Sequence, residues 1–475
     1  MDQHLEGQLA SFTAYIDAIS GAMGHLDRAG PMRDYCTGLL LPGERKSVEP
    51  MAAIIAPSRT GAQHQSMLHL VGQAPWSDEA VLAKVRELVL PAIERSGPVE
   101  AWIVDDTGFG KKGVHSVGVA RQYCGRLGKT DNCQIAVSLS VANHFASLPI
   151  AWRLYLPEIW ANDAARRAKA HVPQEVVFKT KPQIALEQIA AAKAAGVATG
   201  MVLADAGYGS DGEFRAGVTA MGLKYVVGVQ STLSIWPPGM EPLPPKPWSG
   251  RGRKPSRIQR DAEHAPVSAK ALALGLPADA WREVTWREGS NDPLTSRFAA
   301  VRVRPASRDW KRDEPHPLEW LLIEWPENEK EPTKYFLSTL PEEAAIEVLV
   351  DAAKMRWRIE RDYEELKSEL GLAHFEGRSW RGFHHHATLC IAAYGFLIRQ
   401  RAAFPPSDSQ SCQQSGIPRY RRPVKPASPP RTPRPKLHSD CQKNPRRSPG
   451  QNPHPLPMLP ENAGQPAKAG YFMTQ

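Results

Sequence analysis

The chain has 475 residues, 42% of them apolar, and its 59 Lys and Arg against 50 Asp and Glu give a net charge of +9. This length allows two to four domains and a sizeable buried core. No apolar run approaches the roughly 20 residues of a membrane span, and six scattered cysteines without a C-x-x-C pair exclude a disulfide scaffold and a zinc knuckle. We expect a protein of the reducing cytoplasm.

The positive charge is unevenly distributed. Residues 402–475 contain 11 Lys and Arg against 3 Asp and Glu, together with 16 of the 43 prolines. This leaves 48 basic against 47 acidic residues in 1–401, which is close to neutral. A Pro-rich basic segment without apolar periodicity predicts a disordered tail over 402–475. Any contact that the rest of the chain makes with nucleic acid must therefore use local patches.

Residues 1–97 have a helical pattern. Apolar positions recur over 12–23 and again over 80–93, and Ser77 is a good N-cap before the acidic Asp78 and Glu79. Two interpretations stay open for this N-terminal region. It is either a small helical bundle that contacts DNA or a helical extension that packs on the core.

From residue 98 to about 230 the pattern changes to alternating strands and helices. The strands predicted from apolar runs and turn residues are 99–104, 114–120, 134–141, 148–155, 201–204 and 224–229. A helix is expected over 182–195, between Thr180 and Gly196, and another up to residue 221, with Ser210 and Glu213 as a capping box. This order predicts an α/β protein with a mixed sheet and flanking helices.

The alternation stops at about residue 231, and 231–338 reads as a β-rich insertion. It opens with a Pro- and Gly-rich stretch that contains the basic run GRGRKP at 250–255, and strand-like pieces follow at 298–303, 320–324 and 334–337. The basic run is similar to an A·T-hook, in which Arg251 and Arg253 would enter a narrow minor groove. A flexible basic linker is the alternative.

Helical pattern resumes over 339–401. Thr339 and Glu342 form a capping box for a helix that continues, with a break, to Leu370, and Gly371 ends it. A further apolar helix is expected over 384–400. It begins with three histidines, which we expect to cap the helix or to contact phosphate: His384, His385 and His386.

Several charged residues have spacings that suit phosphodiester chemistry. Asp105, or its neighbour Asp106, and Asp205 follow two predicted strands, and strand ends in α/β sheets are where ligand sites collect. Three further charges lie within roughly 60° on one helix: Arg356, Glu360 and Lys367. A carboxylate between two cations can bind a metal and hold phosphates, whereas a solvated face of ion pairs is the bland alternative.

The spacing R-(3)-E-(6)-K of Arg356, Glu360 and Lys367 resembles the Y-R-E-K signature of the DDE transposases of bacterial insertion sequences, in the branch with a long β insertion. The stretch IVDDT at 103–107 is similar to the first catalytic segment of that family, D-x-T/S, and LADAGY at 203–208 is similar to the second. The resemblance covers about 99–400. It departs from the pattern at Ala353, where the signature has Tyr.

The resemblance implies an RNase H-like core built from 98–230 and 339–401. It implies that Asp105, Asp205 and Glu360 bind two Mg²⁺ ions, with Mn²⁺ as a substitute, and that Arg356 and Lys367 hold DNA phosphate. The D-x-T/S pattern places Thr107 two residues after the catalytic Asp, which favours Asp105 and leaves Asp106 as the alternative. Side chains alternate along a strand, so only one of the two should bind metal.

The expected function is that of a transposase which cuts the terminal inverted repeats of its element and joins the 3′-hydroxyl ends to target DNA. Its partners would be double-stranded DNA and a second copy of the chain on the paired ends, at the bacterial nucleoid and not at a membrane. One alternative is a catalytically silent DNA-binding relic. A phosphatase-type hydrolase with Asp105 as nucleophile is a second, but Thr107 occupies the place of the second Asp in its D-x-D pattern.

Overall fold

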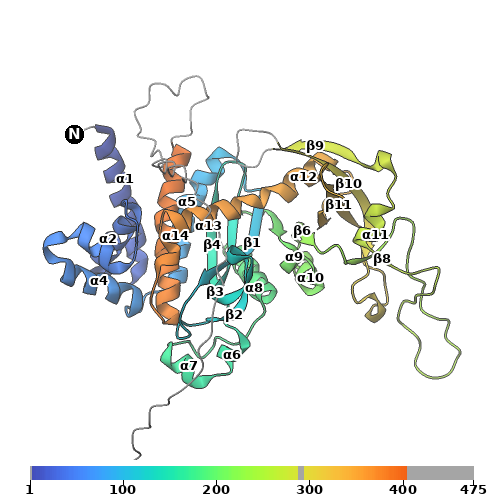
Figure 1. Ribbon diagram of the computed structural model, residues 1–475, viewed down its shortest axis with the longest axis horizontal. Helices are drawn as coiled ribbons and strands as arrows, with labels where there is room; N and C mark the ends of the chain where they lie inside the picture. Colours follow the sequence, from blue (N-terminus) through green and yellow to red (C-terminus); the bar gives the residue numbers. More distant parts are fainter. Residues whose placement is uncertain (1–2, 287–293, 404–475) are drawn as a thin grey trace, which may run out of the picture. The chain divides into compact units, whose positions relative to one another are not determined.

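The computed structural model describes residues 3–286 and 294–403. Beyond residue 403, the tail that we predicted to be disordered lies outside the described residues. The N-terminal region is helical, as predicted, and Figure 1 shows its helices beside the long helix α14 (Trp380–Ala403). The helices of this region are α1 (Gln3–Ser20), α2 (Ala29–Leu40), α3 (Val48–Ile55), α4 (Thr60–Gly72) and α5 (Asp78–Ser96).

The N-terminal helices share one hydrophobic core with the rest of the described chain. Buried residues of α1, α2 and α5 belong to the same cluster as the strands of the sheet. The hydroxyl of Tyr15 in α1 donates to the carbonyl of Ala392 in α14 at 2.8 Å. Within the described residues, no helix combines the length and apolar character needed to cross a bilayer.

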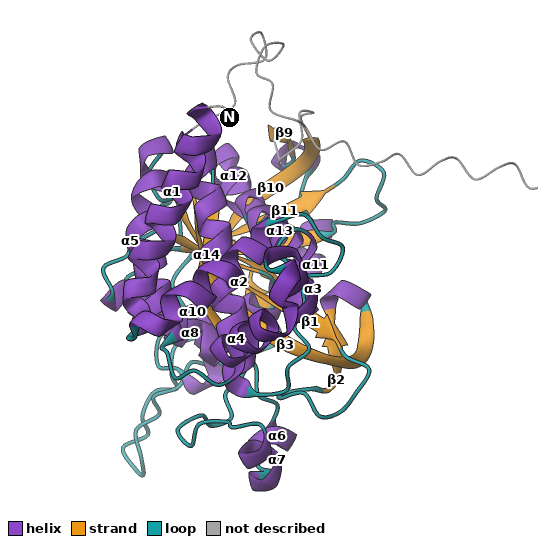
Figure 2. Ribbon diagram, turned by 90° about the vertical axis from the view of Figure 1, so that its left-hand side faces the viewer, coloured by secondary structure: helices purple, strands orange, loops and turns teal. Residues whose placement is uncertain are grey.

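The strands of the described chain form one mixed sheet, and its first part has the RNase H-like order β4-β3-β1-β5-β6. In that part β3 is antiparallel to β1 and to β4, while β5 is parallel to both β1 and β6. Figure 2 shows the strands among the helices that cover them. The strands are β1 (Ala101–Gly110), β3 (Lys129–Ala142), β4 (Ser147–Leu154), β5 (Met201–Ala204) and β6 (Tyr225–Val229), with β2 (Ala120–Cys124) pairing the first half of β3.

The helices between these strands lie on both faces of the sheet. Strand alternation directs Asp105 toward Arg356, at the start of α13 (Trp357–Ser368), and directs Asp106 toward Lys181, at the start of α8 (Lys181–Ala194). Helices α8 and α13 therefore cover opposite faces. The other helices of this part are α6 (Glu158–Ala161), α7 (Ala164–Lys169), α9 (Ala206–Gly209) and α10 (Gly212–Ala220).

The insertion continues the sheet of the core. Strand β12 (Lys334–Ser338) pairs antiparallel with β6, and β11 (Glu319–Trp325) and β10 (Leu294–Pro305) follow on the same sheet. The remaining elements are β7 (Ser234–Trp236), β8 (Val267–Ser268), α11 (Ala269–Leu274) and β9 (Arg282–Trp286). The insertion thus shares hydrogen bonds with the strand that follows the Asp205 segment.

One predicted strand is wrong. Residues 114–119 are irregular, and β2 begins only at Ala120. The physical reason is Gly118, whose φ of +71° breaks an extended run. The apolar positions are still buried: Val117 and Val119 are core residues, and the amide of Val117 donates to the carbonyl of Arg378 at 3.0 Å.

Two predicted helix caps are also wrong, because the hydroxyl groups are directed to amides of distant segments and the helices begin at later residues. Ser210 accepts from the amide of Gln230, and Asp211 caps α10 in its place. Thr339 accepts from the amide of Tyr225 at 2.9 Å, and α12 (Ile346–Met355) begins seven residues later. The caps at Ser77 and Thr180 are confirmed, and a capping box with Gln183 accompanies the second.

The three histidines lie inside α14 and not at its start, so the predicted capping or phosphate role is wrong. His384, His385 and His386 are 5%, 1% and 2% exposed. Helix α14 begins four residues earlier, at Trp380. His386 Nε2 lies 3.1 Å from the carbonyl oxygen of Gly371, which can only accept, so Nε2 carries the proton and Nδ1 accepts from the Tyr35 hydroxyl at 2.8 Å. Burial lowers the pKa of His385 and of His386 to about 4.

These buried histidines predict acid sensitivity. The unfolded chain binds protons at histidine below about pH 6.5, whereas folded His386 stays neutral until about pH 4. The free energy of unfolding should therefore fall between pH 6.5 and pH 4, by up to about 3 kcal/mol from His386 alone. Urea unfolding of His386→Gln should show a correspondingly weaker loss across that window. A pH dependence identical to that of the parent would contradict the assignment, and His69→Gln on the exposed side of α4 is the matched control.

Candidate active site

The first two predicted carboxylates lie side by side on neighbouring parallel strands. Ile103 of β1 pairs with Leu203 of β5, so Asp105 and Asp205 occupy equivalent positions two residues further on. Strand β5 ends at Ala204, as predicted. Strand β1 does not end at Asp105 but runs on to Gly110, because residues 104–110 continue to pair with β3.

The turn after β5 fixes the Asp205 carboxylate. Its Oδ1 accepts from the amides of Gly207 at 2.9 Å and Tyr208 at 3.3 Å, which caps the short helix α9. Helix α9 packs closely against β6, and a Cβ atom at Gly209 would collide with the carbonyl oxygen of Gly228. Glycine at 209 thus allows the close approach that places Asp205 beside β1.

Arg356 joins the first and third predicted carboxylates. Its Nη1 donates to Asp105 Oδ2 at 2.7 Å, and its Nη2 donates to Glu360 Oε1 at 2.7 Å. The residue stands at the break between α12 and α13. Asp105 is 14% exposed and Glu360 is 63% exposed, so one end of this network is buried and the other faces solvent.

Lys367 lies further along the same face of α13. Its Nζ donates to Thr107 Oγ1 and to the carbonyl of Gly108, and it stands 5.0 Å from the centre of the Phe109 ring. The helix therefore follows β1 from Asp105 to Gly108, as the one-face arrangement of Arg356, Glu360 and Lys367 predicted from the sequence.

Asp106 lies on the other side of the strand. Its Oδ2 accepts from Lys181 Nζ at 2.9 Å and from the Tyr208 hydroxyl at 3.3 Å. Asp105 alone of the pair is joined to Arg356, on the face that carries Glu360. The geometry therefore favours Asp105 over Asp106 as the partner of the α13 residues.

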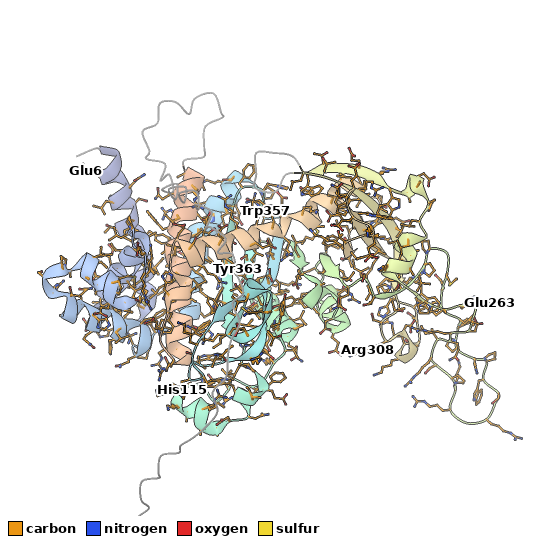
Figure 3. All side chains as sticks on the ribbon, in the orientation of Figure 1. Glu6, His115, Glu263, Arg308, Trp357 and Tyr363 are labelled. Carbon is orange, nitrogen blue, oxygen red and sulfur yellow. The ribbon has the colours of Figure 1, made fainter. Side chains whose placement is uncertain are left out.

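Two buried tyrosines near these carboxylates were not singled out from the sequence. Tyr363 lies on α13 one turn after Glu360 and hydrogen-bonds Ser138 Oγ at 2.8 Å; Figure 3 labels it on that helix. Burial and, to a smaller extent, the Asp105 carboxylate raise the pKa of Tyr363. Burial and the Asp106 and Asp105 carboxylates raise that of Tyr208. Helical spacing from Glu360 was the signal that could have revealed Tyr363.

The carboxylates of the site would be stabilised in their ionised form by a nearby positive charge. The pKa of Asp105 is raised to about 7, because burial and, more weakly, the Asp205 and Asp106 carboxylates raise it by more than the neighbouring Arg356 lowers it. A cation beside Asp105 would favour the ionised carboxylate. The donor set also fits a hard divalent ion, because all three predicted ligands offer carboxylate oxygens. In the described chain, however, their oxygens do not all converge within 4.8 Å, and Arg356 bridges two of them.

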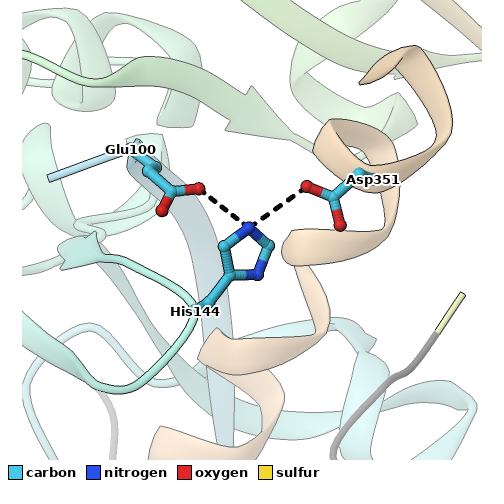
Figure 4. A group of neighbouring side chains, drawn as sticks. All are labelled: Glu100, His144 and Asp351. Carbon is cyan, nitrogen blue, oxygen red and sulfur yellow. Dashed lines mark ion pairs between the residues drawn. The ribbon is translucent and has the colours of Figure 1, made fainter. Parts of the chain in front are cut away.

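In the described chain, three other side chains each bring a possible metal-ligand atom to within 4.8 Å of the other two: Glu100, His144 and Asp351. His144 Nε2 lies 2.9 Å from Glu100 Oε2 and 3.2 Å from Asp351 Oδ2, as Figure 4 shows. The group is partly exposed and lies at the beginning of β1, whereas Asp105 is the fifth of the ten residues of that strand. No sequence motif could reveal it, because its members come from three separate segments.

The two arginines of the basic run stand apart from these carboxylates. Arg251 and Arg253 are exposed on the loop between β7 and β8, and within the described residues no hydrogen bond or ion pair joins them to Asp105, Asp205 or Glu360. Gly250 and Gly252 adopt φ values of +84° and +74°, which gives this loop its tight turns. Ala353, at the place of the signature tyrosine, is buried in α12.

A mixed sheet with an RNase H-like strand order, an aspartate on one strand and a second directly after the neighbouring parallel strand, is the arrangement expected of metal-dependent nucleases. The family model for the DDE superfamily endonucleases matches residues 19–293, which include Asp105 and Asp205 and end before Glu360. The chain belongs to this family.

One relative has a more specific name. The chain is 30% identical over 191 residues to the probable transposase for insertion sequence element IS701 of Microchaete diplosiphon. The aligned part is 40% of this chain and 45% of that relative, so the similarity spans less than half of the relative's length.

The Arg356–Asp105 contact predicts strong energetic coupling. Replacing Arg356 by Met should leave a largely buried carboxylate without its partner, and Asp105→Asn should relieve that loss in the double variant. At pH 8 a double-mutant cycle from urea unfolding should give a coupling of about 1–3 kcal/mol. The exposed pair Lys84 and Glu87 is the control and should give less than about 0.5 kcal/mol. Equal coupling in the two cycles would show that the Arg356 pair does not hold in solution.

Proposed function

We propose that this protein is the transposase of a bacterial insertion sequence. It cuts phosphodiester bonds at the ends of its element and joins the freed 3′-hydroxyl groups to target DNA. Membership of the endonuclease family and the name of the relative support this proposal. The single observation that carries it is the Arg356 bridge, which links Asp105 to Glu360 beside the strand that leads to Asp205.

Asp105, Asp205 and Glu360 are the proposed ligands of two Mg²⁺ ions, which Mn²⁺ can replace. Bound ions would activate the attacking water or hydroxyl and stabilise the leaving oxygen. The ionised form of Asp105 is needed for this role, and Arg356 favours it in the described structure. Asp106 is not a ligand in this proposal, because Lys181 and Tyr208 already hold its Oδ2 on the opposite face.

Arg356 and Lys367 are the proposed contacts to the phosphates of the scissile strand. Arg356 has guanidinium donors on both Asp105 and Glu360, and guanidinium also matches phosphate geometry. Lys367 is held over β1 by Thr107 and Gly108, about two residues along the strand from Asp105. Arg251 and Arg253 would contact the minor groove of the DNA away from the cut.

We propose that the active form is a homodimer on two paired element ends.

The N-terminal helices pack on α14 and share its core, which supports the interpretation of residues 1–97 as an extension of the core. Domain boundaries near residues 98, 231, 339 and 402 remain part of this proposal. Double-stranded DNA, as terminal repeats and as target, is the proposed substrate.

Cleavage of a plasmid that carries the gene with its flanking DNA tests the carboxylates. In Mg²⁺, Asp205→Asn and Glu360→Gln should each reduce cleavage at the element ends by at least about 100-fold, because the loss of a metal ligand should exceed the 10–100-fold effect of losing a second-shell partner. Glu364→Gln, exposed one turn further along α13, is the matched control and should cleave like the parent. If both variants still cleave, the assignment of the three carboxylates as metal ligands is wrong. If the parent does not cleave either, the alternative of a catalytically silent DNA-binding relic is favoured.

A divalent cation should also stabilise the folded protein. Mg²⁺ or Mn²⁺ at about 100 times its Kd should add about 2.7 kcal/mol to the free energy of unfolding. The thermal shift should disappear in Asp205→Asn and persist in Asp351→Asn, whose carboxylate belongs to the Glu100 and His144 group. A shift that depends on Asp351 and not on Asp205 would place the cation at that other group.

A further inference from the structure

A hollow with several cations lies where β1 ends. It has a volume of about 640 Å³, and residues at its wall include Gly110, Lys111, Lys112, His115 and Arg378. Figure 3 labels His115 there, in the loop that follows β1. None of these residues belongs to the proposed metal site or to its two phosphate contacts.

A row of contacts, here called the seam, leads from the candidate active site to this hollow, and its middle part is buried, since Thr107 is 5% exposed. From Arg356 to residue 378, successive residues of the chain contact successive residues of β1 and of the loop that follows it. Arg356 contacts Asp105, Lys367 contacts Thr107 and Gly108, and the carbonyl of Phe375 accepts from Lys111 Nζ at 2.9 Å. The seam ends where the carbonyl of Arg378 accepts from the amide of Val117.

The charges at the far end of the seam face solvent. Lys112 and Arg378 are exposed, and within the described residues no hydrogen bond or ion pair engages either side chain. The hollow has two acidic residues. Glu376 forms an ion pair with Arg45, and the negative charge of Glu44 is offset in number by the positive charge of Lys111. The surplus of positive charge therefore belongs to Lys112 and Arg378.

The loop itself leaves room for a close partner. A Cβ atom added at Gly113 would meet nothing within 4 Å, and one at Gly110 would meet only Leu127 at 3.9 Å. There is thus open space at the two glycines that flank Lys111 and Lys112, and of these two lysines Lys112 is exposed while Lys111 is half-buried against Phe375. This suits the approach of a polyanion to the backbone as well as to the side chains.

We propose that the hollow at the far end of the seam is a phosphate track, with Lys112 and Arg378 binding the DNA backbone beyond the cut. The inference rests on the proposed function, because it assumes that Asp105 marks the position of the scissile phosphate. Six residues of strand separate Asp105 from Lys111, a distance of about 20 Å at about 3.3 Å per residue. At 3.4 Å per nucleotide along one strand, the track meets the backbone about six nucleotides from the cut.

Salt-dependent binding of the full chain tests the track. The probe is a 30-base-pair duplex of arbitrary sequence in buffer with EDTA, followed by fluorescence anisotropy between about 50 and 300 mM NaCl. The double variant Lys112→Glu with Arg378→Glu should bind at least about tenfold more weakly at 100 mM salt. The slope of log affinity against log salt concentration should be smaller in magnitude by about two, one for each lost phosphate contact.

The matched control reverses one Lys and one Arg at the other end of the strands. Lys224 directly precedes β6, Arg95 lies at the end of α5, and both are exposed. The double variant Lys224→Glu with Arg95→Glu should keep the affinity and salt slope of the parent. Binding by the track variant that equals that of this control would overturn the proposal.

Two further outcomes are decisive. If the track variant keeps its affinity for the duplex but loses affinity for polyglutamate, the surface binds an acidic protein and the DNA assignment is wrong. Failure of the proposed function appears in a different assay. A parent that binds DNA through the track but never cuts element ends in Mg²⁺ would refute the transposase and leave the track standing.

Discussion

The contact between Arg356 and Asp105 is the constraint on which the site depends. Asp105 is mostly buried, and a buried carboxylate is stable in its ionised form only beside a positive charge. Arg356 supplies that charge from 251 positions further along the chain and at the same time holds Glu360. The break between α12 and α13 lies at this residue, so the guanidinium group links the start of α13 to β1.

Helix α13 can serve the site because its other face is anchored. Asp362 Oδ1 accepts from Ser147 at 2.6 Å and from Tyr394 of α14 at 2.9 Å, and Glu365 pairs with Arg401 of α14. The preceding helix is held by the buried pair Lys354 and Glu324 of β11, at 2.8 Å. The insertion and α14 therefore both fix the helix that carries Glu360, and the N-terminal helices contribute through their packing on α14.

The placement of the site could be predicted only in part. Strand ends and helical spacing made Asp105 or Asp106, Asp205 and Glu360 candidates and put Arg356, Glu360 and Lys367 on one face, whereas the choice of the three carboxylates as a triad came from the resemblance to a family. Local pattern could not show that β1 continues past Asp105, because β3 supplies the hydrogen bonds that extend it. Nor could it reveal the group of Glu100, His144 and Asp351, since such a group exists only after distant segments meet.

The sequence by itself determined the features that depend on near neighbours: the mixed α/β class, the caps at Ser77 and Thr180, and the spacing of the α13 charges. Only the tertiary structure decided the roles of Ser210 and Thr339, whose hydroxyls accept from the amides of distant residues while the helices begin further along the chain. It also placed Asp106 with Lys181. The physical reason is the same throughout: a polar group has few hydrogen bonds to make, and a partner from a distant segment can occupy the one that local pattern assigns.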